Sequence, residues 1–385
     1  MDPIFLDYNS TTPVDPEIFQ KIKHLNSEQY GNPASLNHTF GQKSKKIIDN
    51  SRIQLASGIG CNTDEIIFTS GATESLNMAI KGIVTASKKN KKHIITTNIE
   101  HKAVIDSLKF VEKHGVAVEY LAVDEYGYVA LESIENAIKE ETILVAILHG
   151  NNEIGTIQPI SKIGMICKKF KIPFLVDAAQ TFGKMNIDVK ESNISMLAGS
   201  AHKIYGPKGS GFLYKKNEIQ IDPLIHGGGH EMGLRSGTLN VFGVAGLALA
   251  FKVMIENREE EIRKLKEHTA HFIKNFKNSN LEFHINGPAH NRLPGNINFC
   301  LKGVDADWLT SMLPDIALAR GSACTSETIQ PSHVLRGIGL SDEHANSSLR
   351  ASFGRFTTVN DINYATEKII ENVKKYLSKK KSLAI

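Results

Sequence analysis

The segment Gly199-Ser200-Ala201-His202-Lys203-Ile204-Tyr205-Gly206-Pro207-Lys208-Gly209 decides how the rest of the chain is interpreted, because it places a lysine between an apolar strand and a glycine-rich turn. Upstream, the apolar run 172–177 ends in Asp177. A pyridoxal phosphate (PLP) site needs this pair: the lysine bonds to the cofactor, and the carboxylate pairs with the pyridinium nitrogen. Taken alone, a lysine beside a glycine turn is more often a solvated loop residue. The rest of the chain favours the PLP interpretation.

Length and composition indicate an ordinary globular protein. The 385 residues exceed the size at which one core keeps growing, so one large domain with a smaller companion is expected. Hydrophobic residues make up 41% and charged residues 22%, and the net charge is only +4. The lysine-rich runs 88–92 and 379–381 are typical of solvated helix ends. We therefore expect no direct nucleic-acid binding.

The four cysteines, Cys61, Cys167, Cys300 and Cys324, are far apart and form no C-x-x-C pair. This spacing argues against structural zinc and against a disulfide framework, as expected for a cytoplasmic protein. The N-terminus lacks the pattern of a signal peptide, and no apolar run is long enough to span a bilayer. We expect no membrane contact.

A pair of histidines, His226 and His230, flanks three glycines. No carboxylate or cysteine stands at a supporting ligand spacing, so we predict no metal site. A loop that presents arginine, serine and threonine after these glycines is better suited to an anion or to a second subunit.

From residue 65 onward the pattern becomes β-α-β, which predicts an α/β fold with a mostly parallel sheet covered on both faces. A long helix over 241–276 is predicted to lead into the second domain, and a final helix begins at Val359. The predicted strands are 66–69, 94–97, 118–121, 144–148, 174–176, 196–198, 212–214 and, in the second domain, 297–301; the other predicted helices are 73–88, 102–113, 161–170 and 306–313.

Polar residues follow most of these strands. Open sheets of this kind bind ligands beyond the carboxyl ends of their strands, so these residues should meet at one edge. The turn 69–75 enters a helix and is either an anion site or an ordinary N-cap; it lacks the spacing of a nucleotide-binding loop. The residues predicted to converge are His101, Asn152, Asp177, Gln180, Ser200, His202 and Lys203.

Two further residues suggest chemistry in the C-terminal part. Cys324 stands among small polar residues in the segment 321–326, whereas Cys167 and Cys300 lie in apolar runs. A cysteine in such surroundings is predicted to be exposed and reactive. Arg350, on a predicted strand, could clamp a substrate carboxylate in bidentate fashion. The opening polar stretch 7–15 could line a site or cap a helix, and capping is the simpler interpretation.

Nearly the whole chain resembles the cysteine desulfurases, PLP enzymes of the aspartate aminotransferase fold type. The resemblance implies PLP-dependent transferase fold type I, with a mostly parallel seven-stranded sheet in a large domain (16–260). Residues 1–15 and 261–385 would form a smaller α+β domain that carries the cysteine loop. The matching segments are 31–35, 69–75, 100–104, 151–155, 200–209, 226–238 and 321–326.

The resemblance also implies a role for each matching residue. Lys203 would carry PLP, and Cys324 and His101 would be catalytic beside it. Asp177 would pair with the ring nitrogen, Gln180 would bond the ring hydroxyl, and His101 would stack on the ring. The phosphate would be held by Ala72, Thr73, Ser200 and His202, with Thr238 from the other subunit of a homodimer; the substrate carboxylate would be oriented by Asn32, Asn152 and Arg350.

The implied reaction converts L-cysteine to L-alanine and leaves a persulfide on Cys324 for an acceptor protein. The segment 321–326 resembles the long-loop branch typified by the iron–sulfur cluster and nitrogen-fixation desulfurases. The acceptor could serve iron–sulfur cluster assembly, tRNA thiolation or sulfur modification of DNA. A selenocysteine lyase, an aminotransferase, or a non-catalytic sulfur-relay or scaffold protein remain as alternatives.

Overall fold

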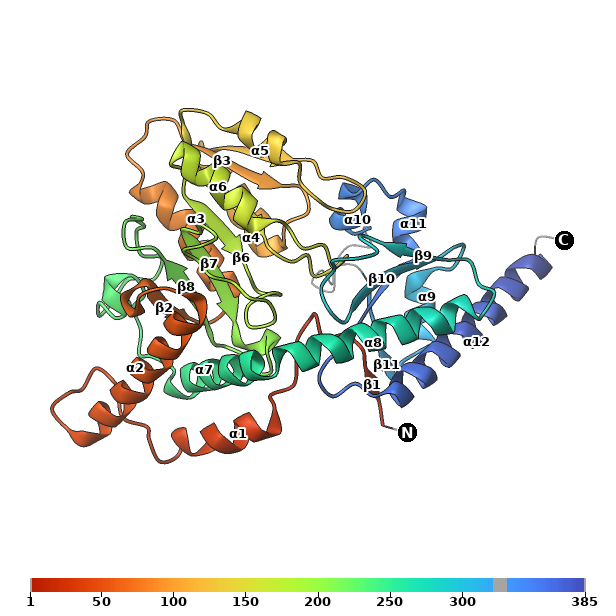
Figure 1. The fold of residues 1–385 in the computed structure, drawn as a ribbon, viewed down its shortest axis with the longest axis horizontal. Helices are drawn as coiled ribbons and strands as arrows, with labels where there is room; N and C mark the ends of the chain where they lie inside the picture. Colours follow the sequence, from red (N-terminus) through yellow and green to blue (C-terminus); the bar gives the residue numbers. More distant parts are fainter. Residues whose placement is uncertain (1, 321–330, 384–385) are drawn as a thin grey trace.

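The computed structural model describes residues 2–320 and 331–383. Its largest element is a seven-stranded sheet in which β8 alone runs opposite to the other strands, which confirms the predicted mostly parallel sheet (Figure 1). In spatial order the strands are β2 (Ile66–Thr69), β8 (Gly211–Lys215), β7 (Met196–Ser200), β6 (Phe174–Asp177), β5 (Thr142–Leu148), β3 (His93–Thr97) and β4 (Ala117–Leu121).

Helices cover both faces of this sheet because its strands are apolar on both sides. Alternate residues of β5 face opposite ways: Val145 and Ile147 belong to one hydrophobic cluster, Leu144 and Ala146 to another. The helices on the first face are α1 (Pro16–Ile22), α2 (Thr39–Ile59), α5 (Leu131–Ala137), α6 (Ile160–Phe170) and α7 (Val241–Glu256); those on the second are α3 (Ala72–Ala86) and α4 (Lys102–Glu112).

A second, four-stranded antiparallel sheet lies beside the first, in the order β12 (Ala319–Arg320), β13 (Ser348–Ser352), β10 (Asn296–Leu301) and β9 (Phe283–Asn286). Its core is aromatic, with Phe272 packing against Phe276, Phe299 and Phe353. The surrounding helices are α8 (Arg258–Lys277), α9 (Ala306–Ser311) and α12 (Val359–Leu383), and the shorter α10 (His333–Gly337) and α11 (Asp342–Asn346) lie between β12 and β13 in sequence.

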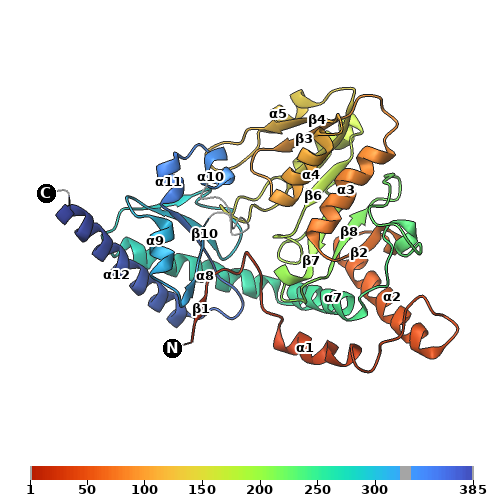
Figure 2. The ribbon, with the colours of Figure 1, turned by 180° about the vertical axis from the view of Figure 1, so that it is seen from behind.

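The N-terminus joins this second core. Strand β1 (Ile4–Phe5) pairs in parallel with β11 (Ile316–Ala317), and Ile4 and Leu6 are buried among the second-core residues. The chain then passes between the two cores before it enters α1 (Figure 2). The division into domains 16–260 and 1–15 with 261–385 stays a prediction.

The single helix predicted over 241–276 is wrong in one respect, since the structure has two helices, α7 and α8, that meet at Asn257. Asn257 leaves the helical conformation, with φ −108° and ψ 7°, and its side-chain amide donates to the carbonyl oxygen of Val253 at 2.8 Å. An asparagine that bonds to the preceding turn competes with the helix ladder. The apolar periodicity continues across the break, and so it did not indicate one.

Four short 3₁₀ turns complete the described secondary structure: Lys23–Leu25, Thr63–Glu65, Ala201–Lys203 and Glu231–Gly233. Within residues 2–320 and 331–383, no helix is both long and apolar enough to cross a membrane. The same residues contain no group of three or more His, Cys, Asp or Glu side chains arranged to hold a metal ion.

Candidate active site

A cavity of about 550 Å³ opens at the carboxyl ends of β5, β6 and β7, where the two sheets meet. It is lined from both sides, because the strand ends of the large sheet face Arg350 of β13 and His333 of α10. The sequence-predicted residues that line it are Ala72, Thr73, His101, Asn152, Asp177, Gln180, Ser200, His202, Lys203 and Arg350. The structure thus brings these residues together, as expected for strand ends in a parallel sheet.

Lys203 lies in the 3₁₀ turn directly after β7, and its Nζ donates to the carbonyl oxygens of Asn9 at 2.7 Å and Ser10 at 2.6 Å. Burial lowers the pKa of Lys203 to about 7, and the positive charges of Lys184 and Arg350 contribute to the same shift. The two carbonyl contacts act in the opposite direction, since they stabilise an ammonium group. An amine with a pKa near neutrality can both hold and release a proton in this cavity.

Asp177 ends β6 and is 6% exposed. Its Oδ1 accepts a hydrogen bond from the backbone N–H of Ala179 at 2.9 Å. Burial raises the pKa of Asp177, although His101 and Lys203 lie close enough to oppose the shift. A buried carboxylate of this kind is stabilised by a cation in the cavity.

His101 is the N-cap residue of α4, and its Nδ1 accepts a hydrogen bond from the N–H of Ala103 at 3.1 Å. A backbone N–H can only donate, so Nδ1 is unprotonated and the neutral ring carries its proton on Nε2. Burial lowers the pKa of His101, which favours this neutral form, while Asp177 opposes the shift. The sequence had placed His101 at the site without indicating its tautomer.

Another part of the cavity wall is formed by the start of α3. Gly71 is the N-cap residue with φ 154°, a conformation that favours glycine, and Thr73 lies in the first turn, whose N–H groups have no partner within a helix. His202 contacts Thr11 Oγ1 through Nδ1 at 3.1 Å, and burial lowers its pKa to about 4, so it is neutral. Such a group of N–H donors and hydroxyls suits an anion.

Glu74 also lies in the first turn of α3, and its carboxylate is already paired. Arg235 donates from Nε to Glu74 Oε1 at 2.8 Å, and the N–H of Ser70 donates to Oε2 at 2.8 Å. These bonds hold the pKa of Glu74 below its ordinary value in spite of partial burial. The Glu74 charge is therefore paired with Arg235 and repels a bound anion less than a free carboxylate would.

Comparison with known proteins identifies the family. The aminotransferase class-V family model matches residues 4–364. Cysteine desulfurase IscS of Pseudomonas fluorescens (strain Pf0-1) is 44% identical over 377 residues, which cover 97% of this chain and 93% of the relative. The chain belongs to the class V aminotransferases. Within them it is a PLP-dependent cysteine desulfurase, a sulfur-transferring enzyme.

Further relatives agree. Cysteine desulfurase IscS of Neisseria meningitidis (serogroup C, strain FAM18) is 42% identical over 97% of this chain and 93% of its own length. A solved NifS-like protein superposes with a TM-score of 0.90 at 34% identity, covering 97% of this chain and 99% of the other. SspA in complex with cysteine gives a TM-score of 0.83 at 36% identity over 92% and 100% of the two chains. Fold type I is confirmed.

The residues present fit PLP. The amide of Gln180 donates from Nε2 to the carbonyl oxygen of Asn9 at 2.8 Å, while its buried Oε1 has no hydrogen-bond partner among residues 2–320 and 331–383. A hydroxyl on the cofactor ring would supply the missing donor. In this cysteine desulfurase Asp177 would pair with the ring nitrogen, Lys203 would bond to the aldehyde carbon, and the start of α3 would hold the phosphate.

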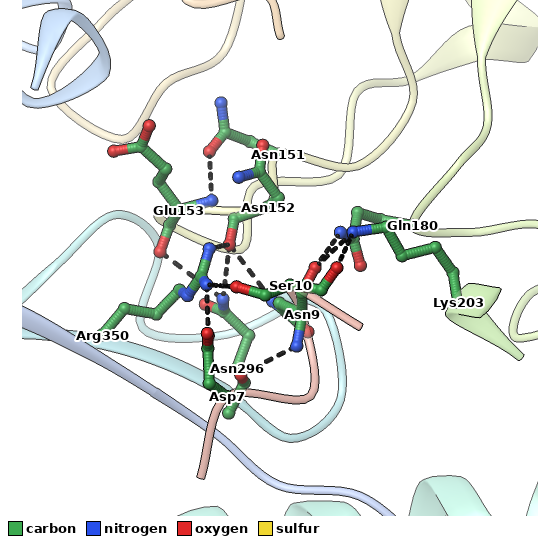
Figure 3. A network of polar contacts seen from close by, with 11 residues as sticks. Asp7, Asn9, Ser10, Asn151, Asn152, Glu153, Gln180, Lys203, Asn296 and Arg350 are labelled. Atoms are coloured by element: carbon green, nitrogen blue, oxygen red, sulfur yellow. Dashed lines mark hydrogen bonds and ion pairs between the residues drawn. The ribbon is translucent and has the colours of Figure 1, made fainter. Parts of the chain in front are cut away.

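Sequence reasoning underestimated the segment 7–10. Asn9 and Ser10 line the cavity, and Asp7 and Ser10 both accept hydrogen bonds from Nη2 of Arg350, with a distance of 2.9 Å for Ser10 (Figure 3). The interpretation of this stretch as a helix cap is correct only for Asp15, which accepts from the N–H of Glu17 at the start of α1. The one available signal was the dense run of polar residues after a short strand.

Three other residues missed by sequence reasoning also line the cavity: Glu100, Glu153 and His333. Burial raises the pKa of Glu153 to about 7, and its Oε2 accepts a hydrogen bond from Ser332. His333 bonds through Nε2 to the carbonyl oxygen of Glu100 at 2.9 Å. These contacts attach α10 to the cavity wall, and each joins parts of the chain far apart in sequence.

Three predicted site residues are not brought to this cavity by the described chain. Asn32 is exposed, and its Oδ1 accepts from the N–H of Ala34 at 2.9 Å, which is ordinary turn chemistry. Thr238 is exposed on the loop after β8. Cys324 lies outside the described residues. The roles of all three stay predictions.

Proposed function

We propose that this enzyme removes sulfur from L-cysteine as a persulfide on Cys324, releases L-alanine, and passes the sulfur to an acceptor protein. The observation that carries the proposal is the convergence of Lys203, Asp177 and Arg350 on one cavity. The amine of Lys203 and the buried carboxylate of Asp177 match the cofactor, and the guanidinium of Arg350 matches the carboxylate of an amino acid.

When bound, PLP supplies an electron sink for carbanion chemistry at the substrate. Arg350 and Asn152 orient the substrate carboxylate, with Asn32 as a further predicted contact. The amine of Lys203, with its pKa lowered to about 7, accepts the proton from the substrate α-carbon. His101 lines the same cavity with its proton on Nε2, and this N–H can serve as a proton donor.

The sulfur step requires a thiolate. Burial raises the pKa of Cys61 and of Cys167 to about 12, and it also raises the pKa of Cys300, so these three cysteines are protonated at neutral pH. Cys324 is left as the proposed nucleophile. Its thiolate forms an S–S bond with the substrate sulfur as the Cβ–S bond breaks, and the electron pair of that bond stays with Cβ, which takes up a proton to become the methyl group of L-alanine.

The proposed acceptor is a protein that serves iron–sulfur cluster assembly, with tRNA thiolation and sulfur modification of DNA as the other destinations. Membership of the cysteine desulfurases motivates these choices. The three described cysteines are free, as suits the reducing cytoplasm that we propose as the location. The two hydrophobic cores support a division into 16–260 and 1–15 with 261–385.

A homodimer is part of the proposal. Thr238 follows a loop that is fixed to its own subunit, since Glu231 pairs with Arg52 and Arg235 pairs with Glu74. Thr238 itself is exposed, in keeping with a phosphate contact in the neighbouring subunit. Mixing Lys203→Ala and Thr238→Ala subunits should then give hybrid dimers with one intact site and restored activity. A fully active monomer would contradict this assembly.

The central test follows radiolabelled sulfur from L-cysteine. The parent enzyme should carry label on Cys324 and form one L-alanine for each sulfur released. Cys324→Ala should bind PLP normally but form neither labelled protein nor L-alanine. If Cys324→Ala still produces L-alanine within about tenfold of the parent, sulfur leaves without this nucleophile. That result would favour a lyase acting on selenocysteine, and keto-acid products would favour an aminotransferase.

A further inference from the structure

We propose that Asp7 is an internal competitor for the substrate carboxylate: it pairs with Arg350 when the site is empty and is displaced when a carboxylate binds. The inference rests on the proposed role of Arg350 in holding that carboxylate. Asp7 acts on the substrate only through Arg350. It lies two residues after β1, at the start of the segment 7–10, and faces the guanidinium in Figure 3.

The N–H donors of Arg350 determine how a carboxylate can bind to it. A guanidinium has five N–H groups. Nη1 donates to the carbonyl oxygen of Asn152 at 3.0 Å, and Nη2 donates both to Asp7 and to Ser10 Oγ. Nε is buried and has no acceptor among residues 2–320 and 331–383. Two N–H groups therefore remain, one on Nε and one on Nη1.

These two remaining groups do not lie on a common edge. A carboxylate binds an arginine in bidentate fashion either through Nε and Nη2 or through Nη1 and Nη2, so both arrangements need a hydrogen of Nη2. Asp7 and Ser10 occupy both hydrogens of that nitrogen. A bidentate substrate carboxylate must therefore displace Asp7 or Ser10 from Nη2.

Of the two acceptors on Nη2, only Asp7 is charged, so it is the stronger competitor of a substrate carboxylate. The Arg350 side chain is only 3% exposed, and a buried guanidinium without an anion is unfavourable. Asp7 supplies that anion in the empty site, whereas Ser10 is a neutral acceptor. The other carboxylate near Arg350, that of Glu153, is bonded to Ser332 instead.

Asp7 is also placed so that its carboxylate can leave without moving the main chain. Its neighbour Leu6 is held by the N–H of Ser352, which donates to the Leu6 carbonyl oxygen at 2.7 Å. The Asp7 side chain, at 15% exposure, retains access to solvent while Arg350 does not. A rotation of one side chain therefore exchanges the internal carboxylate for the external one.

The consequence concerns the product. L-Alanine carries the same carboxylate as L-cysteine, so Asp7 lowers the affinity for both by the same factor. Competition of this kind prevents the enzyme from holding its product tightly and speeds the release of L-alanine. A residue that merely held Arg350 in place would have the opposite effect, since its removal would weaken the binding of every carboxylate.

The test measures the dissociation constant of L-alanine on the PLP-loaded enzyme by calorimetry, for the parent, Asp7→Asn and Ser10→Ala. Asp7→Asn should bind L-alanine about tenfold more tightly, the weight of one charge-assisted contact, and should lower KM for L-cysteine together with kcat. Ser10→Ala should change the L-alanine affinity much less. Equal or weaker binding by Asp7→Asn would overturn the proposal.

Two controls keep this outcome interpretable. Ethylamine lacks a carboxylate, so its binding should be the same in the parent and in Asp7→Asn; a parallel gain for ethylamine would overturn the competition. Arg350→Gln tests the underlying role separately, because unchanged L-alanine affinity in that variant would show that Arg350 does not hold the carboxylate. If Asp7→Asn does not fold, Asp7→Ser is measured against the same expectation.

Discussion

Replacing Asp177 with asparagine should change the stability of the apoprotein and its affinity for PLP in opposite directions. Asp177 is buried at the end of β6, and burial raises its pKa. The folded state thus holds a proton on this group more tightly than the unfolded state does, so the free energy of unfolding falls as the pH rises above the ordinary aspartate range. Asp177→Asn lacks this fall. Its apoprotein should be more stable than the parent at neutral pH, by a margin that shrinks in acid.

The same substitution should weaken the binding of PLP. The pyridinium nitrogen would give Asp177 a buried cationic partner, and removing one member of such a pair costs about 3–5 kcal/mol, or roughly a hundredfold to a few thousandfold in the dissociation constant. Lys203 is unchanged in the variant, so its covalent bond to PLP contributes equally to both proteins. The ratio of their dissociation constants therefore reports the loss at Asp177.

Urea unfolding of the two apoproteins at neutral and acidic pH measures the first effect, and equilibrium dialysis with PLP measures the second. Asp106→Asn is the matched control, because this aspartate is largely exposed on α4 and should change neither quantity. A less stable Asp177→Asn apoprotein that binds PLP within about threefold of the parent would refute the reasoning. Asp177 would then stabilise the fold and contribute little to the binding of PLP.

Three other expectations can be tested directly. Borohydride treatment of the yellow holoenzyme should fix PLP on Lys203, which peptide mapping would show, and label on Lys208 would contradict the assignment. At neutral pH only Cys324 should react quickly with a thiol reagent, so Cys324→Ala should remove the fast phase. Gly164→Ala should lower the free energy of unfolding by about 1–3 kcal/mol or more in urea, because a Cβ there would lie 1.9 Å from the carbonyl oxygen of Ser192.

The strand ends of the large sheet could be predicted because each carries its own signal. An apolar run such as that of β6 stops at a polar residue, and the parallel topology then brings Asp177 and Lys203 to one edge. Local patterns were less informative where a side chain hydrogen-bonds to the main chain of its own helix. The break at Asn257 depends on one amide bonded to Val253, and the surrounding hydrophobic periodicity is unaffected.

The contacts of Arg350 could not be predicted for a different reason. Asp7 and Arg350 are 343 residues apart, and they meet only because β1 joins the core of the second sheet. No spacing along the chain indicates such a pair. The sequence supported a carboxylate clamp at Arg350, but not that an internal carboxylate and Ser10 already occupy both hydrogens of its Nη2.

The segment 7–10 contacts both Lys203 and Arg350, two residues on which the proposed chemistry depends. Its side chains, those of Asp7 and Ser10, bind the arginine that would hold the substrate. Its main chain, through the carbonyl oxygens of Asn9 and Ser10, binds the Nζ of Lys203. Main-chain carbonyls are common to every residue, so no side-chain pattern can mark them as ligands of a lysine. The position of this segment between the two cores therefore sets the geometry at both ends, and substitutions that loosen β1 should disturb Lys203 and Arg350 together.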